Sequence, residues 1–517
     1  MPIPYDGQIF AVQDEQGTPH LLRAFGNQFH ASFETMDGYT VVKNPESGTF
    51  DYARVSADKH ALESTGVPVG AAPPEMLGLP PHARLSRAVA LEQARTSELG
   101  VGPPPRWVVR RAQRRLMHAR GARAVGPEGA PPPGATVGTY VGLCILIQFP
   151  DVSGTIPQSE VNNYCNQVGY TGFGNNGSVR DYFWDVSRHK LTYTNVVTNY
   201  YTAAHNRDHY TDPSITYGTR ARELIREALD WLVASSFSFA PLSSDSGGYI
   251  YALNIFYAGP TVNAWSEGLW PHSWNLGTPY VVGSKRFFDY QFTSMGSQLA
   301  LGTFCHENGH MICDFPDLYD YGYESRGSGR FCLMSSSGST NPVQVGAYLK
   351  NAAGWSDSVT PISAGTHSVV AGQNDFHLHE RTSTEYFIIE NRQQTGRDAT
   401  LPDAGLAIWH IDETGSNNNE QMTAALHYEC ALEQADGAFN LESGANSGDS
   451  GDLYGGPSAP AFDNTTTPSS RWWDGSSSGL TITSISSPGP TMTFTVGGTP
   501  PGTSAELDPG TRLLLLG

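Results

Sequence analysis

A run of glycine and proline from Gly126 to Gly134 constrains the fold of this chain more than any other stretch of its sequence. Proline has no backbone N–H to donate, and glycine loses the most conformational entropy on ordering, so neither a helix nor a central strand can continue through the run. We therefore expect an exposed linker there, which divides an N-terminal portion from a much longer remainder.

The composition is that of a loop-rich globular protein. Hydrophobic residues make up 39% and charged residues 16% of the 517 positions, and 56 glycines and 35 prolines supply turns, which excludes a coiled coil or a disordered tail. The length allows roughly two to four domains with cores of their own. The net charge of −19 argues against a nucleic-acid partner, because phosphates are neutralised by clustered lysine and arginine. It leaves carboxylates available for binding cations.

The sequence shows neither a signal peptide nor a membrane span. The segment from Met1 to Asp6 lacks a basic region followed by an apolar run, and no stretch approaches the ~20 apolar residues that cross a membrane. We expect a monomer that stays inside the cell or leaves it by a route that the sequence does not show.

Three disulfides and buried free thiols are both compatible with the six cysteines, which are Cys144, Cys165, Cys305, Cys313, Cys332 and Cys430.

Local patterns predict an α+β chain with regions in a fixed order. Residues 1–75 read as short strands joined by turns, and residues 76–135 as a basic helical segment followed by the linker. Residues 136–355 alternate buried strands with helices. Residues 356–497 show strand-like runs between Gly, Ser, Asn and Asp turns, the pattern of a β-sandwich-like region. Residues 498–517 form a tail.

Three segments have particularly clear patterns. Tyr140 to Phe149 is almost continuously apolar and β-branched, which predicts a buried strand. Ser178 is a capping residue ahead of helical spacing as far as Val186, and residues 295–313 predict a further helix. The basic segment predicts a solvated helix face, and beside the linker it also offers a site to a processing protease. Its arginines are Arg106, Arg110, Arg111, Arg114, Arg115, Arg120 and Arg123.

The chemistry of the sequence centres on the run H-E-N-G-H from His306 to His310. Residues i and i+4 of a helix share a face, so the two imidazoles can bind one metal ion. Glu307, one position along, can then reach a water molecule on the metal and take its proton as the water attacks a carbonyl. Pro316 must end or bend the helix, and a carboxylate beyond it can return as a third ligand.

This stretch resembles the M6 family of metallopeptidases, the immune inhibitor A-like enzymes allied to the metzincins. The resemblance rests on the H-E-N-G-H run, on Pro316 to Asp320, and on Leu333-Met334 as a methionine turn beneath the site. Other segments look like that family's N-terminal prosegment and its β-rich C-terminal part. They are Phe25 to His30 and Thr35 to Tyr39 for the first, and Tyr386 to Arg392, Leu406 to Asp412 and Leu432 to Gly437 for the second.

The resemblance implies a secreted zinc endopeptidase that acts on protein or peptide substrates and is made as a zymogen, with a metzincin-like catalytic domain. Glu307 is the implied catalytic base. The spacing departs from the metzincin pattern, because Cys313-Asp314 stands where a glycine is expected and one extra residue follows. Asp314 and Asp320 therefore remain alternatives for the third ligand. The implied zinc ligands are His306, His310 and Asp317.

A second cation site is expected in the acidic, glycine-rich loop from Glu433 to Asp463. Hard oxygen donors in such a loop suit calcium, and a solvated acidic loop is the simpler alternative. His272 and His410 are expected to be structural, since two histidines and one carboxylate complete a catalytic zinc set. The candidate calcium ligands are Glu433, Asp436, Asp449 and Asp452, with Asn446 and Asp463 nearby.

Two other functions compete with peptide hydrolysis. A catalytically inactive, zinc- or calcium-stabilised extracellular binding protein would use its β region for partners, but Glu307 disfavours it because structural zinc sites close with a fourth protein ligand. A zinc esterase or deacetylase would act on other carbonyls.

A latent zymogen needs a donor that competes for the metal, and no cysteine precedes Cys144. Asp37 is the candidate, with a hairpin turn before Gly38 as the alternative.

Overall fold

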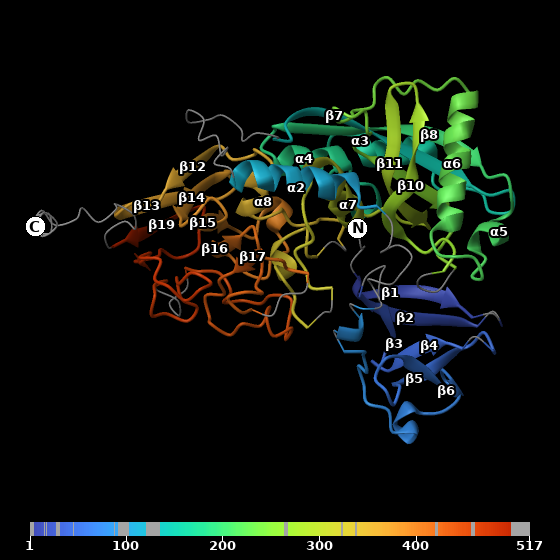
Figure 1. Ribbon diagram of the computed structural model, residues 1–517, viewed down its shortest axis with the longest axis horizontal. Coiled ribbons are helices and arrows are strands. Elements are labelled where there is room, and N and C mark those ends of the chain that lie inside the picture. The colour runs from blue at the N-terminus through green and yellow to red at the C-terminus, as the bar shows by residue number, and fades with distance from the viewer. Residues whose placement is uncertain are drawn as a thin grey trace, which may run out of the picture.

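A computed structural model gives the fold of the chain (Figure 1). Within the described residues the protein is mixed α/β with several β-sheets, and none of their helices combines the length and apolar character needed to cross a membrane. The predicted linker and tail lie outside the described residues, as do Arg120, Arg123 and residues 27–30. The described ranges are 5–14, 16, 18–26, 31–44, 46–86, 88–90, 92, 103–119, 135–262, 267–321, 324–336, 339–418, 422–455 and 461–497.

The N-terminal region is an antiparallel sheet whose strands pair in chain order, because short turns let each strand fold back on the one before it. Figure 1 shows this sheet as a separate layer below the central part of the molecule. It contacts that part through the rings of Phe10 and Phe33, which pack on Trp270. The strands are β1 (Tyr5–Gln13), β2 (Pro19–Gly26), β3 (Ala31–Thr35), β4 (Thr40–Lys43), β5 (Phe50–Val55) and β6 (Leu62–Pro68), and the 3-10 helix η1 (Pro74–Leu77) follows.

The central sheet has the strand order β10-β11-β9-β7-β8. It is parallel except for β10, an antiparallel strand at its edge. The strands are β7 (Gly138–Gln148), β8 (Leu191–Thr202), β9 (Leu253–Ala258), β10 (His272–Val282) and β11 (Lys285–Met295).

Strand β7 is buried on both faces of this sheet, which confirms the strand predicted from its continuous apolar run. Leu146 belongs to a core shared with α3, α4 and α7. Its neighbour Ile145 belongs to the core on the opposite face, shared with α6. The helices are α3 (Gln158–Asn166), α4 (Val179–Val186), α5 (Arg207–Thr211), α6 (Thr219–Ala234) and α7 (Leu301–Cys313), with η2 (Gly172–Gly174) before α4.

One predicted helix begins at Ser178 as expected, and the other begins later than expected. Ser178 Oγ accepts the backbone N–H of Asp181 at 3.2 Å, and the Asp181 carboxylate accepts the N–H of Ser178 at 3.1 Å, which forms a capping box. The helix predicted over residues 295–313 begins only at Leu301. Met295 is instead the last residue of β11, which pairs with β9 up to that point, because a short apolar run fits a strand as well as a helix.

The C-terminal part is rich in strands, as predicted, and its two sheets share one core. The first sheet has the order β12-β14-β15-β16-β17 and the second β13-β19-β18. Phe387 of β15 and Phe494 of β19 both belong to the shared buried cluster. The elements are η3 (Gly329–Phe331), α8 (Ala347–Ala352), β12 (Ser358–Pro361), β13 (Gly365–Val370), β14 (Asp375–Glu380), β15 (Glu385–Arg392), η4 (Gly396–Asp398), β16 (Gly405–Asp412), β17 (Cys430–Leu432), β18 (Ile482–Thr483) and β19 (Thr491–Val496).

Helix α2 (Arg106–Ala119) is formed by the basic segment. It crosses the middle of the view in Figure 1, packs against α7, and reaches α8 through Arg111 Nη2, which donates to the hydroxyl of Tyr348 at 3.4 Å. A segment that precedes the linker in the sequence therefore packs directly against the helix that carries the H-E-N-G-H run.

Candidate metal centre

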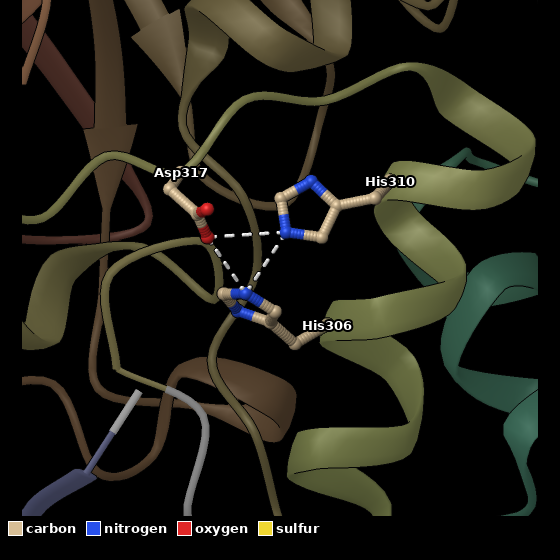
Figure 2. Close-up of side chains that lie close together, drawn as sticks. All are labelled: His306, His310 and Asp317. Atoms are coloured by element: carbon tan, nitrogen blue, oxygen red, sulfur yellow. Dashed lines mark hydrogen bonds and ion pairs between the residues drawn. The ribbon is translucent and has the colours of Figure 1, made fainter. Parts of the chain in front are cut away.

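Helix α7 presents His306 and His310 on one face, and both side chains are fully buried (Figure 2). The helix ends because Asp314 takes a left-handed conformation with φ of 57°, while its N–H still donates to His310 O at 3.0 Å. The chain then reverses through Pro316, which cannot continue a helix. The reversal brings Asp317 opposite the two histidines (Figure 2).

Three side-chain atoms meet at one point. His306 Nε2 lies 3.0 Å from Asp317 Oδ1, His310 Nε2 lies 3.1 Å from the same oxygen, and the two Nε2 atoms are 3.1 Å apart. A tetrahedral zinc ion with bonds of about 2.0–2.1 Å holds its ligand atoms about 3.3 Å apart. The three donors are therefore spaced nearly as three corners of such a site, and the cluster could hold a metal ion.

Backbone carbonyls fix the tautomers of both histidines. His306 Nδ1 lies 3.0 Å from Leu333 O, and His310 Nδ1 lies 2.5 Å from Phe315 O. A carbonyl oxygen only accepts, so each Nδ1 carries a proton and donates it. The Nε2 lone pairs then point at each other and at the carboxylate, an arrangement that a cation between them satisfies.

Asp317 is held at the site by contacts beyond the histidines. Tyr321 donates its hydroxyl to Asp317 Oδ2 at 2.7 Å, and the Asn418 side chain donates to Asp317 O at 3.2 Å and to Tyr319 O at 3.0 Å. Burial alone would raise the pKa of Asp317, but the neighbouring His310 and His306 bring it well below its usual range. Burial lowers the pKa of His306, but Asp317, Glu307 and the carbonyl of Leu333 together raise it above its usual value.

Met334, the residue expected in a methionine turn, packs against α7 at Gly309. A Cβ on Gly309 would lie 3.1 Å from Met334 Sδ and 3.3 Å from Phe315 Cδ2, so the absence of a side chain at Gly309 lets Met334 approach the helix closely. The turn is closed by Ser335 N, which donates to Cys332 O at 3.0 Å. It thereby holds Leu333 O against His306 Nδ1.

Glu307 is fully buried, and neither of its carboxylate oxygens has a hydrogen-bond partner among the described residues. Its charge contributes to the raised pKa of His306, so the carboxylate lies within electrostatic reach of that imidazole. A buried carboxylate without a partner is costly. Beside three converging donors, it fits a site that holds a cation and a water molecule.

Asn308 anchors the opposite face of α7 to the central sheet, a role that the sequence did not reveal. Its Oδ1 accepts the hydroxyl of Tyr193 in β8 at 2.6 Å, and its Nδ2 donates to Asn254 Oδ1 in β9 at 3.0 Å. All three side chains are buried. An asparagine inside an apolar helix was the available signal, because a buried amide must find partners.

The other candidates for the third ligand lie elsewhere. Asp314 faces α2, where Arg110 Nε donates to its Oδ1 at 2.8 Å, and Asp320 Oδ2 accepts from Ser325 Oγ at 3.2 Å. Asp37 is exposed in the turn between β3 and β4, where Gly38 takes a φ of 87°. The turn that was the alternative interpretation is therefore present, and Asp37 does not reach the buried cluster.

His272 and His410 stand apart from the cluster, as expected. His272 is fully buried between Trp270 O at 2.8 Å and the hydroxyl of Tyr290 at 3.0 Å, and burial lowers its pKa to about 4. His410 lies 3.5 Å from Glu385 Oε1 and 3.4 Å from Glu433 Oε1.

All six cysteines are buried free thiols. Of the two alternatives that the sequence left open, disulfides and free thiols, the structure has free thiols.

A second group of carboxylates could also hold a cation. Ligand atoms of Asp436, Asp449 and Asp452 lie within 4.8 Å of one another. Glu433, predicted to join them, lies outside this group, because its carboxylate approaches His410 instead. Burial and neighbouring acidic groups raise the pKa of Asp452 to about 7, and Asp452 Oδ1 has no hydrogen-bond partner among the described residues. Asp463 is used in a local turn, where its Oδ1 accepts from Thr465 N at 2.7 Å.

No protein-family model matches this chain, and no curated protein matches it either. The fold and the site thus define a mixed α/β protein with a buried cluster of two histidines and one aspartate that could hold a metal ion.

Proposed function

We propose that the chain is a zinc-dependent endopeptidase of the M6 type, with a metzincin-like catalytic domain between its N-terminal sheet and its β-rich C-terminal part. The observation that carries the proposal is the convergence of His306 Nε2, His310 Nε2 and Asp317 Oδ1 on one point. Glu307 follows the first histidine on α7, and its carboxylate is buried without a partner among the described residues.

The donor set favours zinc. Two imidazoles and one carboxylate leave one position of a tetrahedral zinc ion open, as in catalytic sites, whereas calcium and magnesium prefer oxygen donors throughout. The same donors also suit non-haem Fe(II). Glu307 favours hydrolysis over oxygen chemistry, because a carboxylate in this helical position serves as the general base of metallopeptidases.

Each residue around the metal centre has its own role in the proposed hydrolysis. When bound, zinc supplies a Lewis acid that polarises a peptide carbonyl and lowers the pKa of water. A carboxylate oxygen of Glu307 takes one proton from the attacking water and then gives it to the nitrogen of the leaving amine as the C–N bond breaks. Leu333 O and Phe315 O keep the imidazoles oriented. The hydroxyl of Tyr321 on Asp317 Oδ2 leaves Oδ1 to face the histidines.

Latency and secretion belong to the same proposal, since the resemblance implies a secreted zymogen. The side chains of His306, His310 and Asp317 are all 0% exposed, so a peptide cannot reach them in this arrangement. Trp107 of α2 lies against His310 with ring centroids 4.8 Å apart. A covered site supports the proposal of a zymogen, and a calcium ion on Asp436, Asp449 and Asp452 would stabilise its C-terminal part.

The test is a casein or fluorogenic-peptide assay with metal analysis, run on the full chain before and after cleavage at a protease site inserted between residues 126 and 134. The wild type should bind about one zinc per chain and hydrolyse peptide after cleavage. Glu307→Gln should keep the zinc and lose activity by about 10²–10⁴-fold. Glu63→Gln, an exposed change on β6, is the matched control and should behave as the wild type.

The inactive binding protein remains the competing function. It predicts zinc in both Glu307→Gln and wild type, with no hydrolysis by either one before or after cleavage. Equal activity of the two proteins would instead contradict the role of Glu307. Hydrolysis of acyl esters or acetyl-lysine peptides without cleavage of casein would point to the esterase or deacetylase alternative.

A further inference from the structure

The segment that leads into α2 crosses the edge of the central sheet before it reaches the metal centre. Asn275 of β10 donates its Nδ2 to Pro103 O at 2.7 Å. The buried Asp289 of β11 then accepts the backbone N–H of Arg106 at 2.8 Å and that of Trp107 at 3.4 Å. Strands β10 and β11 therefore fix the first turn of α2. In that turn the ring of Trp107 lies against the ring of His310, with centroids 4.8 Å apart.

Two arginines of α2 hold the carboxylate at the end of α7. Arg110 Nε donates to Asp314 Oδ1 at 2.8 Å, and Arg114 Nη2 lies 3.0 Å from Asp314 Oδ2. Arg110 Nη2 also donates to Met311 O at 2.7 Å, one of the carbonyls left unpaired at the end of α7. The guanidinium of Arg110 lies 4.9 Å from the ring centre of Tyr251. Asp314 itself is only 1% exposed.

The next two arginines hold a second buried carboxylate. Arg111 Nη2 contacts Glu429 Oε1, and Arg115 Nη2 lies 2.7 Å from Glu429 Oε2. Tyr348 of α8 donates its hydroxyl to the same Oε1 at 2.5 Å. The Glu429 side chain is 4% exposed. One helix thus places arginines at i and i+4 on each of two carboxylates, one from the end of α7 and one from the residue before β17.

The two carboxylates that α2 contacts belong to other parts of the chain, so their negative charge stays in place if α2 leaves. The opposite face of the helix is open to solvent, with Leu116 59% exposed, so one face alone makes the contacts. If α2 leaves, Asp314 and Glu429 each lose both arginines, and the two negative charges attract a new cationic partner. We call Asp314, Glu429, Tyr251 and Tyr348 the arginine-binding surface.

We propose that the arginine-binding surface is a recognition site for arginine-rich helical segments of other polypeptides, and that α2 occupies it in the uncut chain. Guanidinium groups match the surface because they bind carboxylates through several N–H groups and pack on aromatic rings. The inference rests on the proposed function in that such segments would belong to substrates. While α2 is in place, Trp107 covers His310 and the same helix excludes those substrates.

The first test weakens the resident helix in the full chain. In a variant with Arg110, Arg111, Arg114 and Arg115 changed to Gln, α2 loses its ion pairs, so a fluorescently labelled peptide of residues 103–119 should bind in its place. We expect its Kd to be at least about 10-fold lower for this variant than for the wild type, by fluorescence anisotropy at low salt. A peptide with the same four changes is the control and should not bind.

The second test removes the carboxylates on the same background. Asp314→Asn and Glu429→Gln should each weaken binding of the labelled peptide by at least about 10-fold. Asp357→Asn is the matched control, since this carboxylate pairs with Arg188 and Lys190 away from α2, and it should leave binding unchanged. Circular dichroism checks that each variant is folded, and Glu429→Gln alone carries the comparison if Asp314→Asn does not fold.

The outcomes separate this inference from the proposed function. A folded four-glutamine variant that does not bind the peptide, or binding that survives both carboxylate changes, overturns the recognition site. Hydrolysis of a fluorogenic peptide is measured on the same zinc-loaded variant without the labelled peptide, after cleavage at the site inserted between residues 126 and 134. Peptide binding without hydrolysis would sustain the recognition site and contradict the peptidase, whereas hydrolysis without peptide binding would do the reverse.

Discussion

Replacing Arg392 with methionine should destabilise the protein strongly, because this arginine pairs with two buried carboxylates. Its Nε and Nη2 donate to Asp398 at 2.8 Å each, and its Nη1 donates to Glu390 Oε1 at 3.3 Å and to Phe331 O at 3.2 Å. Arg392 is 2% exposed, and Asp398 and Glu390 are 3% exposed. Methionine fills part of the space but leaves both carboxylates without this partner.

The expected loss is about 3–5 kcal/mol in the free energy of unfolding, the range for removing one partner of a buried ion pair. Urea titration followed by tryptophan fluorescence measures it. Arg188→Met is the control, because Arg188 and Asp357 are 37% and 32% exposed and such pairs contribute at most about 1 kcal/mol. A loss for Arg392→Met no larger than that of the control would refute the reasoning.

Replacing Arg392 with methionine should also affect zinc binding at the metal centre. Phe331 O, which Arg392 holds, lies two residues before Leu333, whose carbonyl orients His306. We therefore expect Arg392→Met also to weaken zinc binding, measured by competition with a chromophoric chelator. A double change with Asp398→Asn should cost less than the sum of the two single changes, since it removes the uncompensated charge. Additive losses would show that the pair is not coupled.

Four further outcomes follow from the site. His310→Ala should lose the zinc found by elemental analysis in the wild type, and tight zinc retention by Asp317→Ala would move the third ligand elsewhere. Calcium added after EDTA treatment and zinc repletion should raise the Tm, and an unchanged Tm would exclude the second cation site. Because the pKa of Asp452 is raised to about 7, stability without calcium should fall as pH rises from about 4 to 7, and the Tm gain from calcium should be larger above pH 7, where the carboxylate is ionised. The four-glutamine variant of α2 should release zinc to a chelator faster than the wild type, and an equal rate would show that α2 does not cover the metal centre.

Much of the fold follows from local patterns in the sequence. The apolar run of β7 and the capping box at Ser178 each depend on residues close in the chain, so both elements could be predicted. The start of α7 could not, because the residues before Leu301 fit a strand equally well and the pairing of β11 with β9 decided the outcome. Strand pairing joins distant segments, and the sequence around one strand does not specify its partner.

The candidate site was predictable where helix geometry alone sets it. The spacing of His306 and His310 places both imidazoles on one face, whereas choosing Asp317 over Asp314 required the left-handed turn at Asp314, which a non-glycine residue rarely adopts. The role of α2 could not be predicted. Its arginines read as a solvated face because their partners, such as Glu429, lie more than 300 positions away in the sequence.

Strand β7 has a consequence for how the molecule unfolds. Its side chains alternate between two cores, one containing α7 and the other α6, and its backbone is hydrogen-bonded to β8 and β9 on its two sides. Neither layer can open without exposing the other, so the two layers form one cooperative unit. The amides of β7 should be among the slowest in this part of the chain to exchange with solvent. Ligand binding at the metal centre should therefore slow exchange on the far face of the sheet as well, without any contact between the two.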